Sequence, residues 1–157
     1  MVELTQAFLA ALTEGGLHAA AARGAELSPR LKHSAVAVET EQRDAAPGGF
    51  SSYLGISDGQ ELYGMRLNAK MRLDVLSPTK LGAAECRKAM DLAAGVLAQG
   101  VEGVSICQIV SHAPEYDPVG DCFAGKLEVW CHSWLCSVPS QEEPGSLEHF
   151  ILKGALT

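Results

Sequence analysis

Cysteine and histidine side chains that could hold a metal ion concentrate between residues 107 and 136. They are Cys107, His112, Cys122, Cys131, His132 and Cys136. Structural zinc sites usually place ligand pairs about two to four residues apart, so that one turn presents both ligands. Cys131 and Cys136 are five residues apart, and on a strand they would point to opposite faces. The spacing favours buried thiols beside surface histidines, and we predict neither a metal nor a cofactor.

Nucleophilic catalysis would need an activated serine or cysteine with a base held beside it. His112, His132 and Cys131 could be combined for this purpose, but no local signature surrounds any of them. Glycine-rich phosphate loops of the GxxxxGK[ST] or GxGxxG type are also missing from the sequence. We therefore predict a protein that is not an enzyme.

Acidic side chains form two small groups. Glu142 and Glu143 lie in an expected linker, where a solvated surface is the simple interpretation, whereas Glu115 and Asp117 could bind a cation weakly.

The chain as a whole is acidic, because its 12 Lys and Arg are outnumbered by 19 Asp and Glu, which gives a net charge of −7. Proteins that grip nucleic acid need clustered cations, so we predict no nucleic-acid binding.

Trp130 and Trp134 are the most distinctive large side chains. They lie four residues apart, interleaved with His132, and would share one face of a strand. Tryptophan is enriched at the energetic centres of protein interfaces. Two interpretations stay open: a protein interface, or a second hydrophobic layer covered by the chain's own N-terminal segment.

Length and composition predict a single α+β domain spanning residues 1–157. A chain of this length with 47% hydrophobic residues can bury a core without disulfides. The odd count of five cysteines, and residues 1–22 that lack the basic start of a signal peptide, predict free thiols in a cytoplasmic protein. The sequence contains no run of 18 apolar residues, so we predict no membrane-spanning helix.

The clearest structural signal is an alternation between residues 63 and 75, where every odd residue is apolar. This pattern predicts a strand with one face in the core and one in a polar setting. Thirteen residues would reach roughly 43 Å, about twice the usual strand length. We expect this strand to project from the domain and to offer unpaired backbone groups to a neighbouring subunit.

Other elements follow from periodicity and from the position of Gly and Pro. We expect helices over 2–14 and 77–99, strands over 35–38, 50–56, 101–111, 123–138 and 147–153, a charged stretch over 39–44, and loops over 45–49, 111–120 and 139–145; residues 17–33 are not assigned. This order predicts a mostly antiparallel twisted sheet of about four to five strands, with helices packed on one face.

The face opposite the helices would then carry the polar even-numbered residues and the tryptophans. As a hypothesis, its oligomer interface consists of Arg66, Asn68, Lys70, Arg72, Trp130 and Trp134. Head-to-tail contacts of this kind close into rings when the rotation between subunits allows it.

Five segments along the chain carry a family resemblance: 2–8, 53–55, 61–64, 130–135 and 150–154. In them the chain resembles small tail-region proteins of phages and prophages of Gram-positive gut bacteria. In size and element order it is similar to the tail terminator and tail-completion class. The resemblance implies a ring-forming subunit, commonly hexameric, whose partners are itself and other tail or connector proteins, in the host cytoplasm and the assembled virion.

Two alternatives stay open. The chain could be another tail or baseplate adaptor, which differs only in its partners. It could also be a small-molecule-binding protein or enzyme that uses the polar face, which would require a deep pocket with convergent polar groups.

Overall fold

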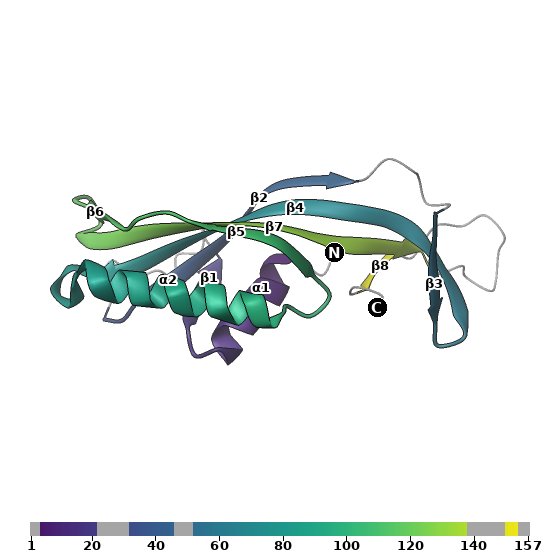
Figure 1. Ribbon diagram of the computed structural model, residues 1–157, viewed down its shortest axis with the longest axis horizontal. Helices are drawn as coiled ribbons and strands as arrows, with labels where there is room; N and C mark the ends of the chain where they lie inside the picture. Colours follow the sequence, from purple (N-terminus) through teal and green to yellow (C-terminus); the bar gives the residue numbers. More distant parts are fainter. Residues whose placement is uncertain (1–3, 22–31, 46–51, 138–149, 154–157) are drawn as a thin grey trace.

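A computed structural model describes residues 4–21, 32–45, 52–137 and 150–153 of the 157-residue chain (Figure 1). The elements in chain order are α1 (Leu4–Glu14), β1 (His18–Ala21), β2 (Ala35–Ala45), β3 (Ser52–Ser57), β4 (Gln60–Pro78), a 3₁₀ turn (Thr79–Leu81), α2 (Gly82–Gln99), β5 (Ser105–Ser111), β6 (Glu115–Asp117), β7 (Cys122–Ser137) and β8 (Phe150–Lys153). The predicted α+β class is confirmed. Within these ranges, no helix is long and apolar enough to cross a membrane.

All strands belong to one eight-stranded sheet with the central order β1-β2-β4-β7-β5. β3 pairs with β4, and β6 and β8 pair with β7. β1 runs parallel to β2, whereas the other pairs are antiparallel. The prediction of four to five strands is therefore wrong: the sheet is larger and mixed. The strands that were missed, β1 and β6, are too short to carry an alternation signal.

β4 is longer than predicted, at 19 residues, and lies in the middle of the sheet. One of its edges pairs with β3 over residues 60–64 and with β2 over residues 67–76. The other edge pairs with β7 over residues 63–78. The expectation that this strand offers unpaired backbone groups is wrong, because the hairpin partner β3 and the more distant strands β2 and β7 occupy its two edges.

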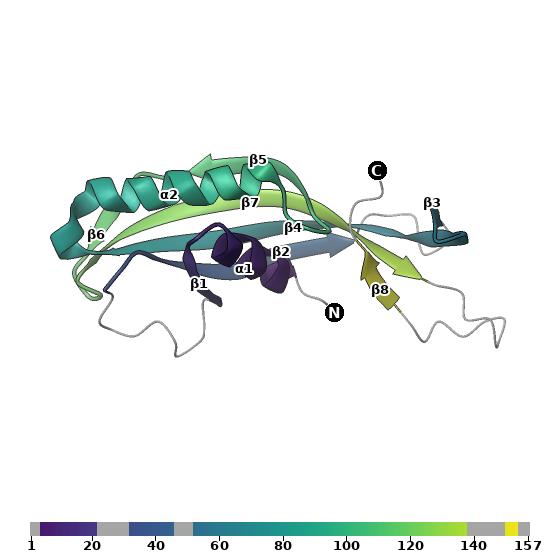
Figure 2. The same ribbon diagram turned by 90° about the horizontal axis from the view of Figure 1, so that it is seen from below.

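Both helices lie on one side of the sheet, as predicted, and bury the odd-numbered face of β4 and β7 (Figures 1 and 2). Met71, Leu73, Val75, Leu127 and Val129 are completely buried on this face. The helices contribute their apolar stripes to the same core, with Phe8 and Leu12 from α1 and Met90, Ala93 and Leu97 from α2. The alternation therefore predicts the core side chains of β4 correctly from Leu67 to Val75, whereas Tyr63 and Met65, which the pattern also placed in the core, are only half-buried and lie outside it.

Gly15 and Gly16 end α1, as predicted. The Gly16 N–H donates to the Thr13 carbonyl, and the Leu17 N–H donates to the Leu12 carbonyl, both at 3.0 Å. This pair of bonds satisfies carbonyls that the last turn would leave open, and it requires the positive φ of 89° at Gly16. The chain then turns directly into β1.

Several predicted boundaries differ from the structure. β2 continues through the charged stretch 39–44 to Ala45, the first residue of the predicted loop 45–49, and a 3₁₀ turn separates Pro78 from the start of α2. β3 covers residues 52–57, and β8 covers the last four residues of the predicted strand 147–153. The predicted loop at 46–49, the linker 139–145, residue 138 and residues 147–149 lie outside the described residues.

Candidate functional site on the uncovered sheet face

The sheet face opposite the helices, here called the polar face, consists of even-numbered side chains of β4 and β7. These are Arg66, Asn68, Lys70, Arg72 and Asp74 on β4 and Lys126, Glu128, Trp130 and His132 on β7. The antiparallel register places them in direct cross-strand pairs: Asn68 opposite His132, Lys70 opposite Trp130 and Arg72 opposite Glu128. Opposite residues in such pairs lie close enough to interact.

Two β-bulges add side chains to this face. The register of β2 against β4 shifts between Thr40 and Gln42, which makes Glu41 the extra residue. The register of β5 against β7 shifts between Ile106 and Gln108, which makes Cys107 the extra residue. Bulges re-aim side chains and recur next to functional sites.

The bulge at Cys107 also corrects a prediction from simple alternation. Alternation along the predicted strand 101–111 places Val104, Ile106, Gln108 and Val110 on one face. Instead, Ile106 and Ile109 both pack against the core, while Gln108 pairs with Trp130 of the polar face.

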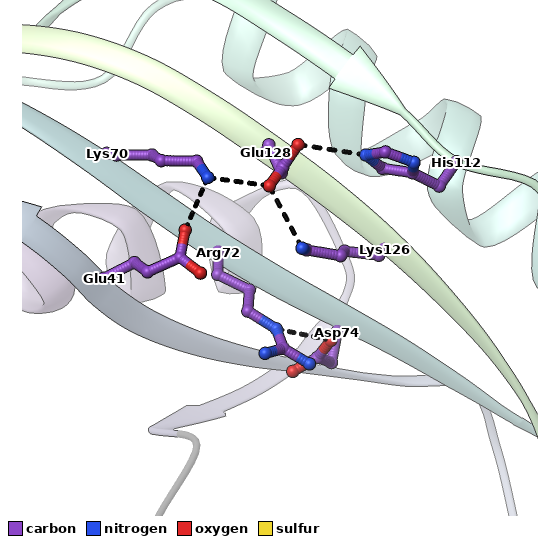
Figure 3. Close-up of polar contacts among 7 residues, drawn as sticks. All are labelled: Glu41, Lys70, Arg72, Asp74, His112, Lys126 and Glu128. Atoms are coloured by element: carbon purple, nitrogen blue, oxygen red, sulfur yellow. Dashed lines mark hydrogen bonds and ion pairs between the residues drawn. The ribbon is translucent and has the colours of Figure 1, made fainter.

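Glu128 lies at the centre of an ion-pair cluster on the polar face (Figure 3). One carboxylate oxygen, Oε1, lies 2.8 Å from Lys70 Nζ and 3.0 Å from Lys126 Nζ. The other, Oε2, lies 3.0 Å from His112 Nε2. Lys70 Nζ also lies 2.8 Å from Glu41 Oε2, so this lysine bridges β2 and β7 across β4.

The cluster shifts the titration of its members. Hydrogen bonds from Lys70, His112 and Lys126 lower the pKa of Glu128 to about 2. The hydrogen bond from Lys70 also lowers the pKa of Glu41, and the bonds to Glu128 and Glu41 raise the pKa of Lys70. The Glu128 carboxylate therefore stays ionised far into acid.

We expect the substitution Glu128→Gln to change the pH dependence of stability. Because the folded pKa of Glu128 lies below its ordinary value of 4.5, its contribution is present above about pH 4.5 and is lost as the pH falls toward 2. In urea unfolding from pH 7 to pH 2, wild type should be the more stable protein at pH 7, and the two curves should converge near pH 2.

The control for this prediction is Glu85→Gln on α2. Glu85 lies 3.8 Å from the exposed Lys88, and exposed pairs contribute little to stability. This variant should follow wild type at every pH. A gap between Glu128→Gln and wild type that stays constant down to pH 2 would contradict the assigned role of Glu128.

A hollow of about 360 Å³ opens on the polar face between the two bulged strands. Its polar and aromatic lining comes from Gln42, Asp44, Asn68, Lys70, Cys107 and Trp130. The Lys70 ammonium lies 5.2 Å from the centre of the Trp130 ring, a cation–π distance. The polar face is therefore not flat, although the hollow is wide and shallow in comparison with an enclosed pocket.

Cys107 and His132 lie side by side on the polar face. Cys107 Sγ is 3.1 Å from His132 Nδ1, and Nη2 of Arg66 is 3.5 Å from the same nitrogen. Burial, and then the positive charge of Arg66, lower the pKa of His132. Sequence spacing could not reveal this pair, because the β5–β7 register and the bulge bring together residues 25 positions apart.

The structure places the hypothesised interface residues in different situations. Arg66 and Asn68 are exposed and bonded to each other, with Arg66 Nε 3.1 Å from Asn68 Oδ1. Lys70 and Arg72 are already ion-paired within the chain, Arg72 with Asp74 at 3.1 Å. Trp130 is half-buried beside Lys70. The backbone of Trp134 pairs with Arg66, and its side chain lies outside what the structure describes.

The interpretation that the N-terminal segment covers the tryptophans is wrong for the described part of that segment. α1 packs into the core on the helix side, with Phe8 completely buried. Its Thr5 hydroxyl lies 3.1 Å from that of Thr40, which contacts the core residue Met71. α1 therefore does not cover the face that carries Trp130.

The cysteines differ sharply in exposure. Cys86, Cys122 and Cys131 are buried free thiols, whereas Cys107 is exposed. Burial raises the pKa of Cys131 to about 12 and also raises that of Cys86 and Cys122. Among the side chains that the structure describes, no three His, Cys, Asp or Glu come together in a way that could hold a metal ion.

Comparisons with known proteins add no assignment. No protein-family model matches the chain, and no curated protein matches it at a significant level.

Proposed function

We propose that the chain is a structural subunit of a phage or prophage tail, of the tail terminator or tail-completion class. In this proposal it is not an enzyme, and copies associate head to tail into a ring. Its partners are other copies of itself and neighbouring tail or connector proteins. The proposal starts from the resemblance of segments along most of the chain to small phage tail proteins.

The observation that carries the proposal is the polar face, which neither helix of the described residues covers. Both helices cover the other side of the sheet, and the strands extend past the helix layer at the end where β3 pairs with β4 (Figure 2). A wide surface with the exposed Arg66 and Asn68 and the half-buried Trp130 ring is thereby left for a partner. Tryptophan and arginine are the side chains that most often dominate interface energies.

The backbone groups available for strand addition lie elsewhere than the sequence suggested. β1 and β5 are the outer strands of the central sheet order, and an edge strand can accept a strand from another chain. A contact between the polar face of one copy and an edge of the next would join two different surfaces. Contacts between different surfaces generate rings or open filaments.

The test is a charge reversal at Arg66, because Lys70 bridges three strands through its ion pairs and Arg72 is paired with Asp74 on its own strand. We expect Arg66→Glu to raise the dissociation constant of self-association by about tenfold or more, since that factor corresponds to ~1.4 kcal/mol of lost contact energy. Sedimentation velocity over a concentration series measures the change.

The matched control is Lys88→Glu, which makes the same charge change on the exposed side of α2. It should associate like wild type. A wild-type chain that stays monomeric at all concentrations would refute the ring, and an unchanged Arg66→Glu oligomer would refute the assigned face.

An adaptor elsewhere in the tail or baseplate would use the same surfaces with different partners. The third role considered, a small-molecule-binding protein or enzyme, draws support only from the 360 Å³ hollow.

A further inference from the structure

Cys107 combines three features that occur together nowhere else among the described cysteines. It is exposed, it lies 3.1 Å from an imidazole nitrogen of His132, and it lines the 360 Å³ hollow on the polar face. The thiol therefore has both a base beside it and an open space in which a small molecule can approach. A structural cysteine needs neither.

The hydrogen-bond pattern defines which partner gives up the proton. Arginine is only a donor, so the 3.5 Å contact from Arg66 Nη2 makes Nδ1 of His132 the acceptor. The Cys107 thiol then donates to the same nitrogen, while its other contact, to the Ser105 carbonyl, is longer at 3.9 Å. Burial and then the positive charge of Arg66 lower the pKa of His132, which favours the neutral imidazole, the form whose Nδ1 accepts from the thiol.

We propose that Cys107 is a site of reversible S-thiolation, at which its thiol attacks a small disulfide such as glutathione disulfide with His132 as the base. The Cys107 proton moves to His132 Nδ1, and Sγ forms a bond to one sulfur of the disulfide. The old S–S bond breaks, and the leaving thiolate takes the proton from the imidazolium. Cys107 is oxidised to a mixed disulfide, and the disulfide is reduced to one free thiol.

The surroundings of the thiol suit this reaction. The guanidinium of Arg66 contacts the same imidazole nitrogen as Cys107 and holds it as an acceptor for the thiol. In the adjoining hollow, Asn68 already accepts from Arg66 through Oδ1, which leaves its amide N–H groups for a ligand. Excess thiol reverses the modification by the same exchange chemistry.

The reaction needs only one copy of the chain, but Cys107 shares the polar face with Arg66 and Trp130, which the proposed tail function places at a subunit contact. Thiolation is therefore measured at a concentration at which sedimentation velocity shows the monomer, so that a ring cannot cover the thiol and the failure of one proposal leaves the other intact.

The experiment incubates the full chain with glutathione disulfide at pH 7, quenches samples with acid and assigns each modified cysteine by tandem mass spectrometry. N-acetylcysteine amide serves as the reference thiol under the same conditions. We expect Cys107 to react roughly fivefold faster than the reference or more, and Cys86, Cys122 and Cys131 to stay unmodified because they are buried.

The variant His132→Asn tests whether His132 acts as a base toward Cys107 or only as a hydrogen-bond partner. The asparagine Oδ1 occupies nearly the position of Nδ1 and still accepts a hydrogen bond, but it cannot take up a proton. Its Cys107 rate should fall to that of the reference thiol. A wild-type rate no greater than the reference would overturn the proposal without any variant. An unchanged rate in His132→Asn, or equal labelling of the buried cysteines, would overturn it as well.

Discussion

Replacing Leu97 by alanine is expected to lower the free energy of unfolding by roughly 2–5 kcal/mol, the range found when a completely buried leucine is truncated. Leu97 lies in the last turn of α2 and has no exposed surface. Its side chain belongs to the one core that joins both helices to the sheet. The truncation removes buried apolar surface and leaves a cavity that the packed neighbours fill only in part. Urea unfolding monitored by circular dichroism measures the loss.

Leu92→Ala is the matched control, because it makes the same chemical change on the same helix. Leu92 is 49% exposed, so its truncation removes little buried surface and leaves no cavity. Its effect should be within about 1 kcal/mol of zero, as is usual for surface positions. Equal losses in the two variants would show that α2 does not pack on the sheet as described.

Gly125→Ala is expected to destabilise the protein by about 1–3 kcal/mol, the usual cost of overfilling a packed core. Gly125 is a buried residue of β7 that faces α2. A Cβ atom there would overlap the sulfur of Met90 and lie 3.0 Å from its Cε and 3.1 Å from its Cγ. The methionine side chain would have to leave its position against the sheet. Thermal or urea unfolding measures the effect.

Two companion variants make this prediction specific. Gly95→Ala introduces the same methyl group on α2, where nothing lies within 4 Å of the new Cβ, and it should stabilise the helix by about 0.5–1 kcal/mol. In Gly125→Ala combined with Met90→Ala, the smaller side chain makes room for the new methyl. The double variant should therefore lose less stability than the two single losses added together. Strict additivity would mean that the two residues do not touch.

The two types of surface on the sheet predict that one side tolerates substitution better than the other. On the helix side, apolar side chains without exposed surface exclude water. On the polar face, Lys70, Glu128 and Glu41 remain partly exposed while they bridge three strands. Ion pairs in such a setting align strands while each contributes modestly to stability. In the proposed ring, this face would present Trp130 and Arg66 to the neighbouring copy.

Sequence patterns alone determined the local elements and the sidedness of the long strands. The alternation around Met71 and Leu73 predicts a strand and correctly separates core from polar residues, because strand side chains alternate at a fixed period of two. Gly16 marks the end of α1 correctly, since a positive φ is easily reached only by glycine. These features depend on neighbours a few residues away, so the pattern contains the necessary information.

Tertiary structure alone decided which strands pair and which polar side chains meet. The central position of β4, the parallel β1–β2 pair and the cluster around Glu128 all depend on partners far apart in the chain. The bulges at Glu41 and Cys107 each insert one residue and so reverse the faces on which the following side chains lie. A prediction from alternation fails there, because it assumes that no residue is inserted. For this reason the sequence pointed to Arg66, Lys70 and Trp130 as members of one face, but only the folded sheet placed Cys107 against His132.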